Sequence, residues 1–246
     1  MTPASLAAAL ARPRKLLPNP PEPEEWLESA GERIAIHTLG RPEAAARALF
    51  VHGWETDHRD LARIARTLAG NGAYCVAPDL PAHGTSSGAS MTIPEAARAL
   101  QAVHRAYGPF ELAVGYSMGA AILLYAMANG MPAGKAALVA PPGNYVHELS
   151  KSARAAGAPE ALIAPALDEF RLRCPDLDEL DCIRLAPSLS CLGIVAVAGN
   201  DGVLDPQDGR SLAKLWRGSR LLEREQASHR SILRDPAVAE AIAGLL

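Results

Sequence analysis

The sequence has 246 residues, of which 49% are hydrophobic, and carries a formal net charge of -3 at pH 7. This length and apolar content suit one large α/β domain with a sizeable core. The small net charge provides no broad basic surface, which argues against nucleic acid and against an anionic membrane surface as partners.

The four cysteines are Cys75, Cys174, Cys182 and Cys191. They form no C-x-x-C pair and a chain of this size needs no disulfides, so we expect reduced thiols. The apolar run 6–10 follows no basic residue and is too short for a signal-peptide core. No segment approaches the roughly 18 apolar residues of a membrane span. These features favour a cytoplasmic protein.

The first 25 residues contain prolines at positions 13, 18, 20, 21 and 23. Proline interrupts both helices and strand ladders, so we expect residues 1–25 to form an extended, loosely held arm. A single domain is then expected over residues 26–246.

Short apolar runs alternate with helical patterns along that domain. The expected strands are Arg33–His37, Ala48–Val51, Ala73–Ala77, Glu111–Val114, Ala136–Val139, Gly193–Ala198 and Ser219–Glu223. The expected helices are Asp60–Ala69, Pro94–Tyr107, Met118–Asn129, Gln207–Trp216 and Pro236–Leu245. The alternation predicts an α/β fold in which helices flank both faces of a mostly parallel sheet.

One region, residues 143–187, interrupts this alternation. It has helical patterns at Tyr145–Ala156, Glu160–Arg173 and Asp178–Leu185 but no convincing strand. We interpret it as a small helical cap, because loops of this length usually carry function. Two ordinary crossover helices are the alternative.

Two serines lie in a G-x-S-x-G pattern, Ser117 and Ser86. Ser86 sits in a turn-rich stretch without a strand before it, which favours a polar loop. Ser117 follows a strand-like run and precedes a helical one, which is the context of a nucleophile elbow. Glycines at 115 and 119 would allow so tight a turn. We therefore predict that Ser117 is the nucleophile.

A serine nucleophile needs a base, and the base needs an orienting acid. His229 lies in a loop after the last predicted strand, whereas His147 lies within the insertion. Asp201 and Asp205 follow the strand before it. Asp201 is the expected acid and Asp205 the expected helix N-cap, because Asp205 precedes Pro206 and a helical pattern.

An oxyanion hole requires two backbone N–H groups near the nucleophile. Met118 supplies one at the start of the helix after Ser117, and we expect Trp54 to supply the other because Gly53 lets the chain turn. The side chains of Trp54 and Tyr116 are expected in the substrate pocket. His52 could serve as a second base, but a buried histidine that braces the loop is the preferred interpretation.

These segments resemble the α/β-hydrolase superfamily over nearly the whole chain after residue 30. The matching motifs are HGW at 52–54, DLPAHGTS at 79–86, GYSMG at 115–119, the acid loop at 201–204 and the histidine loop at 228–229. The resemblance implies the fold and a Ser-Asp-His triad. It leaves the substrate open, because many activities share this fold.

The expected function is a serine hydrolase of a small carboxylic ester or thioester, working through an acyl-enzyme on Ser117. One alternative is a C–C bond hydrolase acting on a β-diketone-like ring-cleavage product. Another is a non-catalytic protein that binds a small ligand. The acidic run 176–181 lacks the glycine and glutamate of a calcium loop. No metal or organic cofactor is expected, and the sequence leaves the oligomeric state open.

Overall fold

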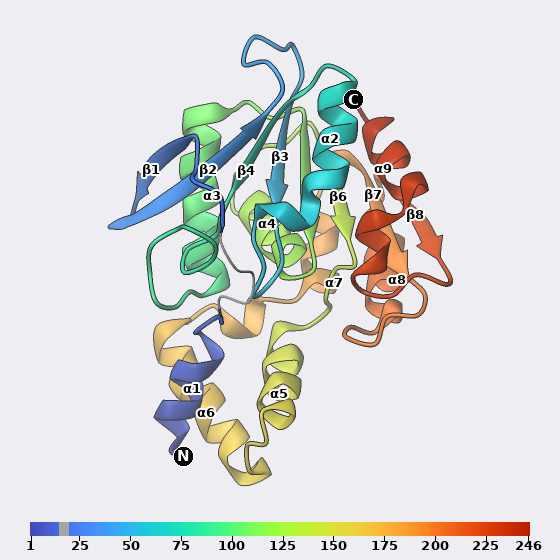
Figure 1. Ribbon diagram of the computed structural model, residues 1–246. Coiled ribbons are helices and arrows are strands. Elements are labelled where there is room, and N and C mark those ends of the chain that lie inside the picture. Colours follow the sequence, from blue (N-terminus) through green and yellow to red (C-terminus); the bar gives the residue numbers. More distant parts are fainter. Residues whose placement is uncertain (15–19) are drawn as a thin grey trace.

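The computed structural model describes residues 1–14 and 20–246, and its strands form one eight-stranded sheet (Figure 1). The strands are β1 (Glu25–Ser29), β2 (Glu32–Leu39), β3 (Arg47–Val51), β4 (Tyr74–Pro78), β5 (Leu112–Tyr116), β6 (Lys135–Val139), β7 (Leu192–Ala198) and β8 (Ser219–Arg224). Their spatial order is β1-β2-β4-β3-β5-β6-β7-β8. β2 pairs antiparallel with β1 and β4, and every other pairing is parallel. The predicted mostly parallel sheet is therefore confirmed.

Helices cover both faces of this sheet (Figure 1). The α-helices are α1 (Pro3–Leu10), α2 (Ala62–Gly70), α3 (Ile93–Tyr107), α4 (Met118–Ala128), α5 (Tyr145–Ala155), α6 (Glu160–Arg173), α7 (Cys182–Leu185), α8 (Pro206–Leu215) and α9 (Pro236–Ala243). The short 3-10 helices are η1 (His58–Leu61), η2 (Leu177–Glu179), η3 (Ala186–Ser188) and η4 (Ser231–Arg234). α3, α4 and α8 bury apolar side chains on one face, and α2 and α9 do so on the other.

The start of two helices follows the local sequence signals. Asp205 accepts a hydrogen bond from the Gln207 N–H at 2.8 Å and caps α8, as predicted. Asp235 accepts one from the Ala237 N–H at 2.9 Å and caps α9. In both helices proline follows the cap, where its missing N–H costs nothing.

The N-terminal segment differs from the expected extended arm, because residues 3–10 form α1. Thr2 and Ser5 make a reciprocal capping box, and Pro3 occupies the first helical position. Leu6 and Ala7 are buried against the core, and α1 lies along α6 (Figure 1). Proline near a helix start favours the helix instead of preventing it. The part of the expected arm at 15–19 lies outside the described residues.

β1 is a strand that the apolar pattern did not predict. It pairs with β2 through the two-residue turn Ala30–Gly31, where both φ angles are positive. Such a turn matches the twist of a hairpin. Most of β1 is exposed, so its sequence has no apolar run.

The segment between β6 and β7 contains α5, α6 and α7 together with η2 and η3. α5 and α6 extend beyond the sheet edge with α1 beside them (Figure 1). All four cysteines are free. Within the described residues, no helix is long and apolar enough to cross a membrane.

Candidate active site

The turn between β5 and α4 places Ser117 at the carboxyl edge of the parallel strands. Ser117 has φ +53° and ψ -123°, a conformation that is costly for a residue with a side chain. Its N–H donates to the Val139 carbonyl at 2.9 Å. A β-carbon at Gly115 would lie 2.7 Å from Ala120 Cα, and one at Gly119 would lie 2.2 Å from the Val51 carbonyl oxygen. Both glycines are therefore required by close approach.

The structure brings Ser117, His229 and Asp201 together, although they come from three separate loops. His229 Nε2 lies 3.0 Å from Ser117 Oγ. His229 Nδ1 lies 2.7 Å from Asp201 Oδ2. Since a carboxylate only accepts hydrogen bonds, Nδ1 carries the proton and Nε2 presents its lone pair to the serine hydroxyl. This tautomer is the one that allows His229 to take a proton from Ser117.

The second carboxylate oxygen of Asp201, Oδ1, is also hydrogen-bonded, which holds the side chain in place. Asp201 Oδ1 accepts hydrogen bonds from the N–H groups of Val203 at 2.8 Å and Leu204 at 2.9 Å. Burial acts to raise the pKa of Asp201, but the hydrogen bonds from His229 and from these two N–H groups outweigh it and lower the pKa. The carboxyl group is therefore ionised at neutral pH and faces His229.

The loop after β3 lies directly against the elbow. A β-carbon at Gly53 would lie 3.3 Å from Ser117 Cβ. Among the described residues, no hydrogen-bond acceptor is found for the Trp54 N–H. Met118 is the first residue of α4, where backbone N–H groups lack acceptors within the helix. Two backbone N–H groups without a helical or loop acceptor in the described part of the chain thus belong to segments that adjoin Ser117.

The direction of the Trp54 N–H is set by the carbonyl of the same peptide. His52 Nδ1 donates to the Gly53 carbonyl at 2.8 Å, and the Thr56 hydroxyl donates to it at 3.0 Å. In a planar trans peptide the N–H points opposite to the carbonyl. His52 Nε2 accepts from the Leu80 N–H at 2.9 Å, which fixes the proton on Nδ1. Burial lowers the pKa of His52, so the ring is neutral and serves as a brace.

Tyr116 does not line a pocket as expected. It is 2% exposed, and its hydroxyl donates to the His229 carbonyl at 3.1 Å. The Tyr116 and His229 rings lie 5.1 Å apart between centroids. Tyr116 is the last residue of β5 and lies on the same buried face of the strand as Leu112 and Val114, whereas the next residue, Ser117, forms the turn. Tyr116 therefore supports His229 from below.

Ser86 has a local role within the buried loop after β4. It is 1% exposed, and its hydroxyl donates to the Asp79 carbonyl at 2.7 Å and accepts from the Ala35 N–H at 2.8 Å. These bonds join the loop to β2. The structure thus keeps Ser86 apart from the histidine that faces Ser117.

Within residues 1–14 and 20–246, His37, His58 and Asp79 are the only group with three potential metal ligands close together. The two imidazole rings stack 3.5 Å apart at an interplanar angle of 17°. Nearly parallel rings do not direct their lone pairs at one ion. The Asp79 oxygens instead accept from His58 Nδ1 at 2.9 Å, from His37 Nε2 at 3.3 Å and from the Thr85 N–H at 2.9 Å. We interpret the group as a brace between β2, η1 and the loop after β4.

The acidic run at 176–181 takes part in local contacts. Asp176 accepts the Tyr125 hydroxyl at 2.6 Å, and Asp178 pairs with Arg171 at 2.7 Å. Asp181 caps α7 through the Ile183 N–H at 2.9 Å. The three carboxylates therefore point to different partners and do not converge.

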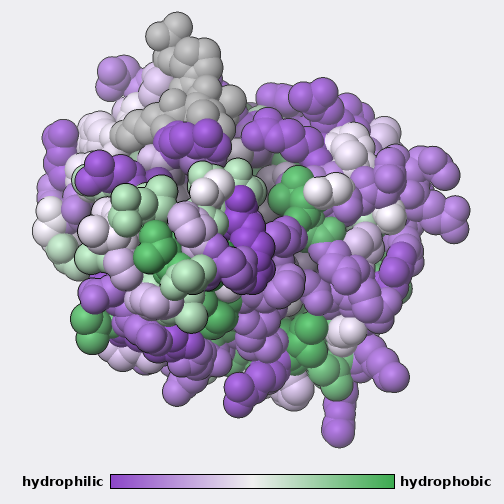
Figure 2. All heavy atoms as spheres, turned by 90° about the horizontal axis from the view of Figure 1, so that it is seen from below, coloured by the Kyte–Doolittle hydropathy of each residue, from purple (hydrophilic) through white to green (hydrophobic). Residues whose placement is uncertain are grey.

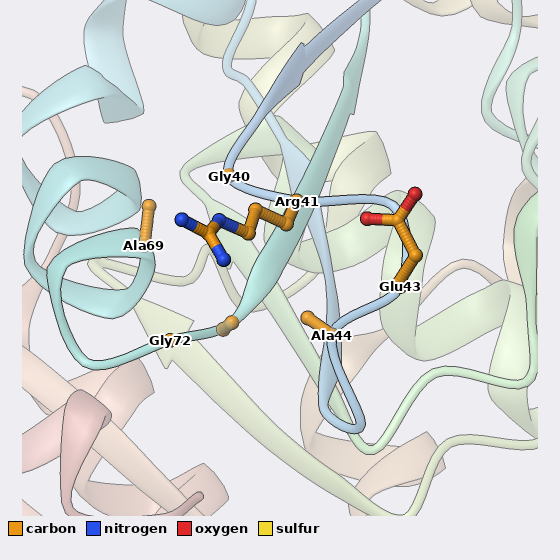
Figure 3. A pocket seen from close by; sticks show the side chains of 7 residues that line it. Gly40, Arg41, Glu43, Ala44, Ala69 and Gly72 are labelled. Carbon is orange, nitrogen blue, oxygen red and sulfur yellow. The ribbon is translucent and has the colours of Figure 1, made fainter.

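A hollow lies away from Ser117, at the amino ends of β3 and β4 (Figure 3). It encloses about 620 Å³ and is lined mainly by backbone and alanine side chains, with Arg41 and Glu43 at its rim. Parallel strands carry their catalytic loops at the opposite, carboxyl edge. This hollow is therefore separate from the candidate site.

A match to the family model for the alpha/beta hydrolase family covers residues 48–241. The chain belongs to this family. Among solved structures, this α/β hydrolase is similar to an esterase from Pyrococcus furiosus, with a TM-score of 0.74 and 15% identity over 96% of this chain and 97% of that chain. No curated protein matches it.

Two further solved structures share the fold. One is an enol-lactonase from Burkholderia xenovorans, with a TM-score of 0.70 and 17% identity over 90% of this chain and 99% of that chain. The other is a thioesterase domain from the curacin biosynthetic pathway, with a TM-score of 0.67 and 18% identity over 90% and 97% of the two chains. At these identities the likeness shows a common fold.

Proposed function

We propose that this α/β hydrolase cleaves a small carboxylic ester or thioester through an acyl-enzyme on Ser117. The observation that carries the proposal is the hydrogen-bonded chain from Ser117 Oγ to His229 Nε2, at 3.0 Å, and from His229 Nδ1 to Asp201, at 2.7 Å. A serine on a strained turn, hydrogen-bonded to a histidine that is itself hydrogen-bonded to an ionised acid, is the arrangement that acyl transfer requires.

The first half of the reaction forms the acyl-enzyme. His229 accepts the Ser117 proton as Oγ attacks the substrate carbonyl carbon, and Asp201 stabilises the imidazolium that results. The N–H groups of Trp54 and Met118 stabilise the negative charge on the former carbonyl oxygen. His229 then gives its proton to the alkoxide or thiolate that leaves.

The second half releases the acid. His229 removes a proton from water, and the resulting hydroxide attacks the acyl carbon in the same oxyanion hole. The proton returns from His229 to Ser117 Oγ as the carbon–oxygen bond to the enzyme breaks. No redox change occurs at any step.

The size of the substrate is inferred from the segment that faces the site. The segment between β6 and β7 holds only three α-helices and two 3-10 helices, and aromatic residues make up only 4% of the sequence. Large apolar channels need more lining than this. The esterase, thioesterase and lactonase named in the similar structures support acyl transfer as the reaction class.

A fluorophosphonate probe tests the nucleophile. We expect wild-type protein to be labelled once, with mass spectrometry placing the adduct on Ser117, and Ser117→Ala to remain unlabelled. A folded wild-type protein that is not labelled would contradict the proposal and favour a ligand-binding role.

A panel of p-nitrophenyl esters tests the substrate range. We expect kcat/KM to be highest for short acyl groups, because the small cap leaves little apolar surface for long ones. A kcat/KM that rises steadily from acetyl to palmitoyl esters would overturn the size inference while leaving the reaction class intact.

A further inference from the structure

The N-terminal segment 3–14 is packed onto the helices beyond the sheet edge. Leu6 is 2% exposed and Ala11 is 1% exposed, and both belong to the core cluster that includes α5 and α6. The Ala11 carbonyl accepts a hydrogen bond from the Met91 N–H at 2.8 Å. Figure 2 shows this end of the molecule, where hydrophilic side chains predominate and apolar ones lie in smaller groups among them. The segment is therefore an ordered part of the domain.

The segment ends at a specific contact with the loop after β3. The Arg14 guanidinium donates to Glu55 through Nε at 2.7 Å and through Nη2 at 2.7 Å. The Arg14 backbone N–H donates to the same carboxylate at 3.1 Å. A bidentate pair with an added backbone donor fixes both position and orientation of the carboxylate.

Glu55 directly follows Trp54, whose N–H we place in the oxyanion hole. Its φ angle is +58°, in the left-handed region that residues with a side chain adopt at a cost of about 1 kcal/mol or more. This conformation closes the turn 53–56, in which the Thr56 hydroxyl reaches the Gly53 carbonyl. That carbonyl belongs to the peptide whose N–H is that of Trp54.

A contribution to folding stability does not by itself explain the ion pair between Arg14 and Glu55. The Arg14 side chain is 75% exposed, so solvent screens its charge and weakens what the pair adds to folding. Glycine at position 55 would adopt the same φ without strain. Burial acts to raise the pKa of Glu55, but the Arg14 hydrogen bonds outweigh it and lower the pKa, so the carboxylate is ionised where Arg14 can hold it.

We propose that Arg14 and Glu55 are positioning residues of the oxyanion hole: Arg14 holds Glu55 in its left-handed conformation, which keeps the turn 53–56 closed and directs the Trp54 N–H toward Ser117. The inference rests on the proposed function of Ser117. It makes the N-terminal segment a strap on the catalytic loop.

Kinetics of Arg14→Ala test the strap, with Arg12→Ala as the matched control. Arg12 is an exposed arginine of the same segment, and its side chain makes no hydrogen bond among those found in the described residues. We expect Arg14→Ala to lower kcat about tenfold, a fraction of the loss caused by deleting an oxyanion donor, with KM changed less than about twofold. Arg12→Ala should match wild type.

A second variant separates positioning from general damage. In Glu55→Gly the conformation of the turn no longer depends on Arg14, so adding Arg14→Ala to Glu55→Gly should cause no further loss of kcat. A boronic acid that forms an adduct with Ser117 should bind more weakly to Arg14→Ala than to wild type, because its oxygen occupies the oxyanion hole. It should bind equally well to Glu55→Gly and to Arg14→Ala/Glu55→Gly.

The outcomes distinguish the two proposals. Wild type that neither turns over esters nor reacts with a fluorophosphonate overturns the proposed function and the strap with it. Active wild type with an Arg14→Ala variant whose kcat equals that of Arg12→Ala overturns the strap alone. If Arg14→Ala lowers kcat by the same factor in the Glu55→Gly background as in wild type, that result also overturns the strap.

Discussion

Asp201 and Asp205 lie in one loop, yet only Asp201 contacts His229, at 2.7 Å. The Asp205 carboxylate is bonded to the Gln207 N–H at 2.8 Å and caps α8. Two acids four residues apart are thus divided between the site and a helix terminus.

This division predicts opposite results for two neutral substitutions. Asp201→Asn should lower kcat by about 10⁴, the scale seen when a triad acid loses its charge. Asp205→Asn should leave kcat near wild type because asparagine also caps helices well. Steady-state kinetics on one ester measure both; the reverse pattern would make Asp205 the triad acid.

Substitutions at the two serines of the G-x-S-x-G patterns should have different effects. One should lower the free energy of unfolding and the other should abolish turnover. Ser86→Ala leaves the buried Ala35 N–H and Asp79 carbonyl without their partner, which should cost about 2 kcal/mol of unfolding free energy. Its kcat should stay near wild type below the melting transition. Ser117→Ala should abolish turnover with little change in urea unfolding. Normal stability with lost activity in Ser86→Ala would contradict this assignment.

Tyr116→Phe tests the support beneath His229. Loss of the hydroxyl removes the 3.1 Å bond to the His229 carbonyl, and we expect a loss of about 1 kcal/mol in unfolding free energy. The His229 loop then holds the ring less well, so kcat should fall severalfold. Tyr125→Phe, which loses a bond to Asp176 away from the site, is the control and should keep its kcat.

The hydrogen bonds of Asp79 predict that the protein loses folding stability at acid pH. Burial acts to raise its pKa, but hydrogen bonds from His37 and His58 outweigh it and hold the pKa well below the ordinary value of 3.8. A carboxyl group with a lowered folded pKa stabilises the fold above its unfolded pKa, and this stabilisation is lost as pH falls below about 4.

Urea unfolding at pH 7, 4 and 3 measures the effect. Asp79→Asn should lose about 3 to 5 kcal/mol at pH 7, because two buried donors lose their charged acceptor, and its stability should then depend less on pH below 4. Asp168→Asn removes an exposed carboxylate and should retain the wild-type pH dependence. Equal pH dependence in Asp79→Asn and wild type would contradict the assignment of Asp79.

Features with a short-range sequence signal could be predicted. The elbow at Ser117 needed only flanking glycines between a strand and a helix, and the cap at Asp205 needed only the proline that follows it. The loop order then gave His229 and Asp201. Their mutual distances depend on strand order, which the sequence does not state.

Features that depend on distant partners could not be predicted. β1 carries no apolar run because most of it is exposed, and its pairing depends on a hairpin turn with positive φ angles. The hydrogen bond from Tyr116 to the His229 carbonyl joins positions 113 residues apart. The Arg14–Glu55 pair joins positions 41 residues apart, and neither residue belongs to a recognisable motif.

The dependence of α1 on α6 also sets an order of assembly. An isolated helix of 8 residues is too short to persist in water, and its partner α6 lies roughly 150 positions later in the chain. During synthesis α1 therefore has nothing to pack against until most of the domain has been made. We expect it to be the last element to order and an early one to open. Arg14 lies shortly after the end of α1 at Leu10, so we expect its pair with Glu55 to form in the same step that orders α1.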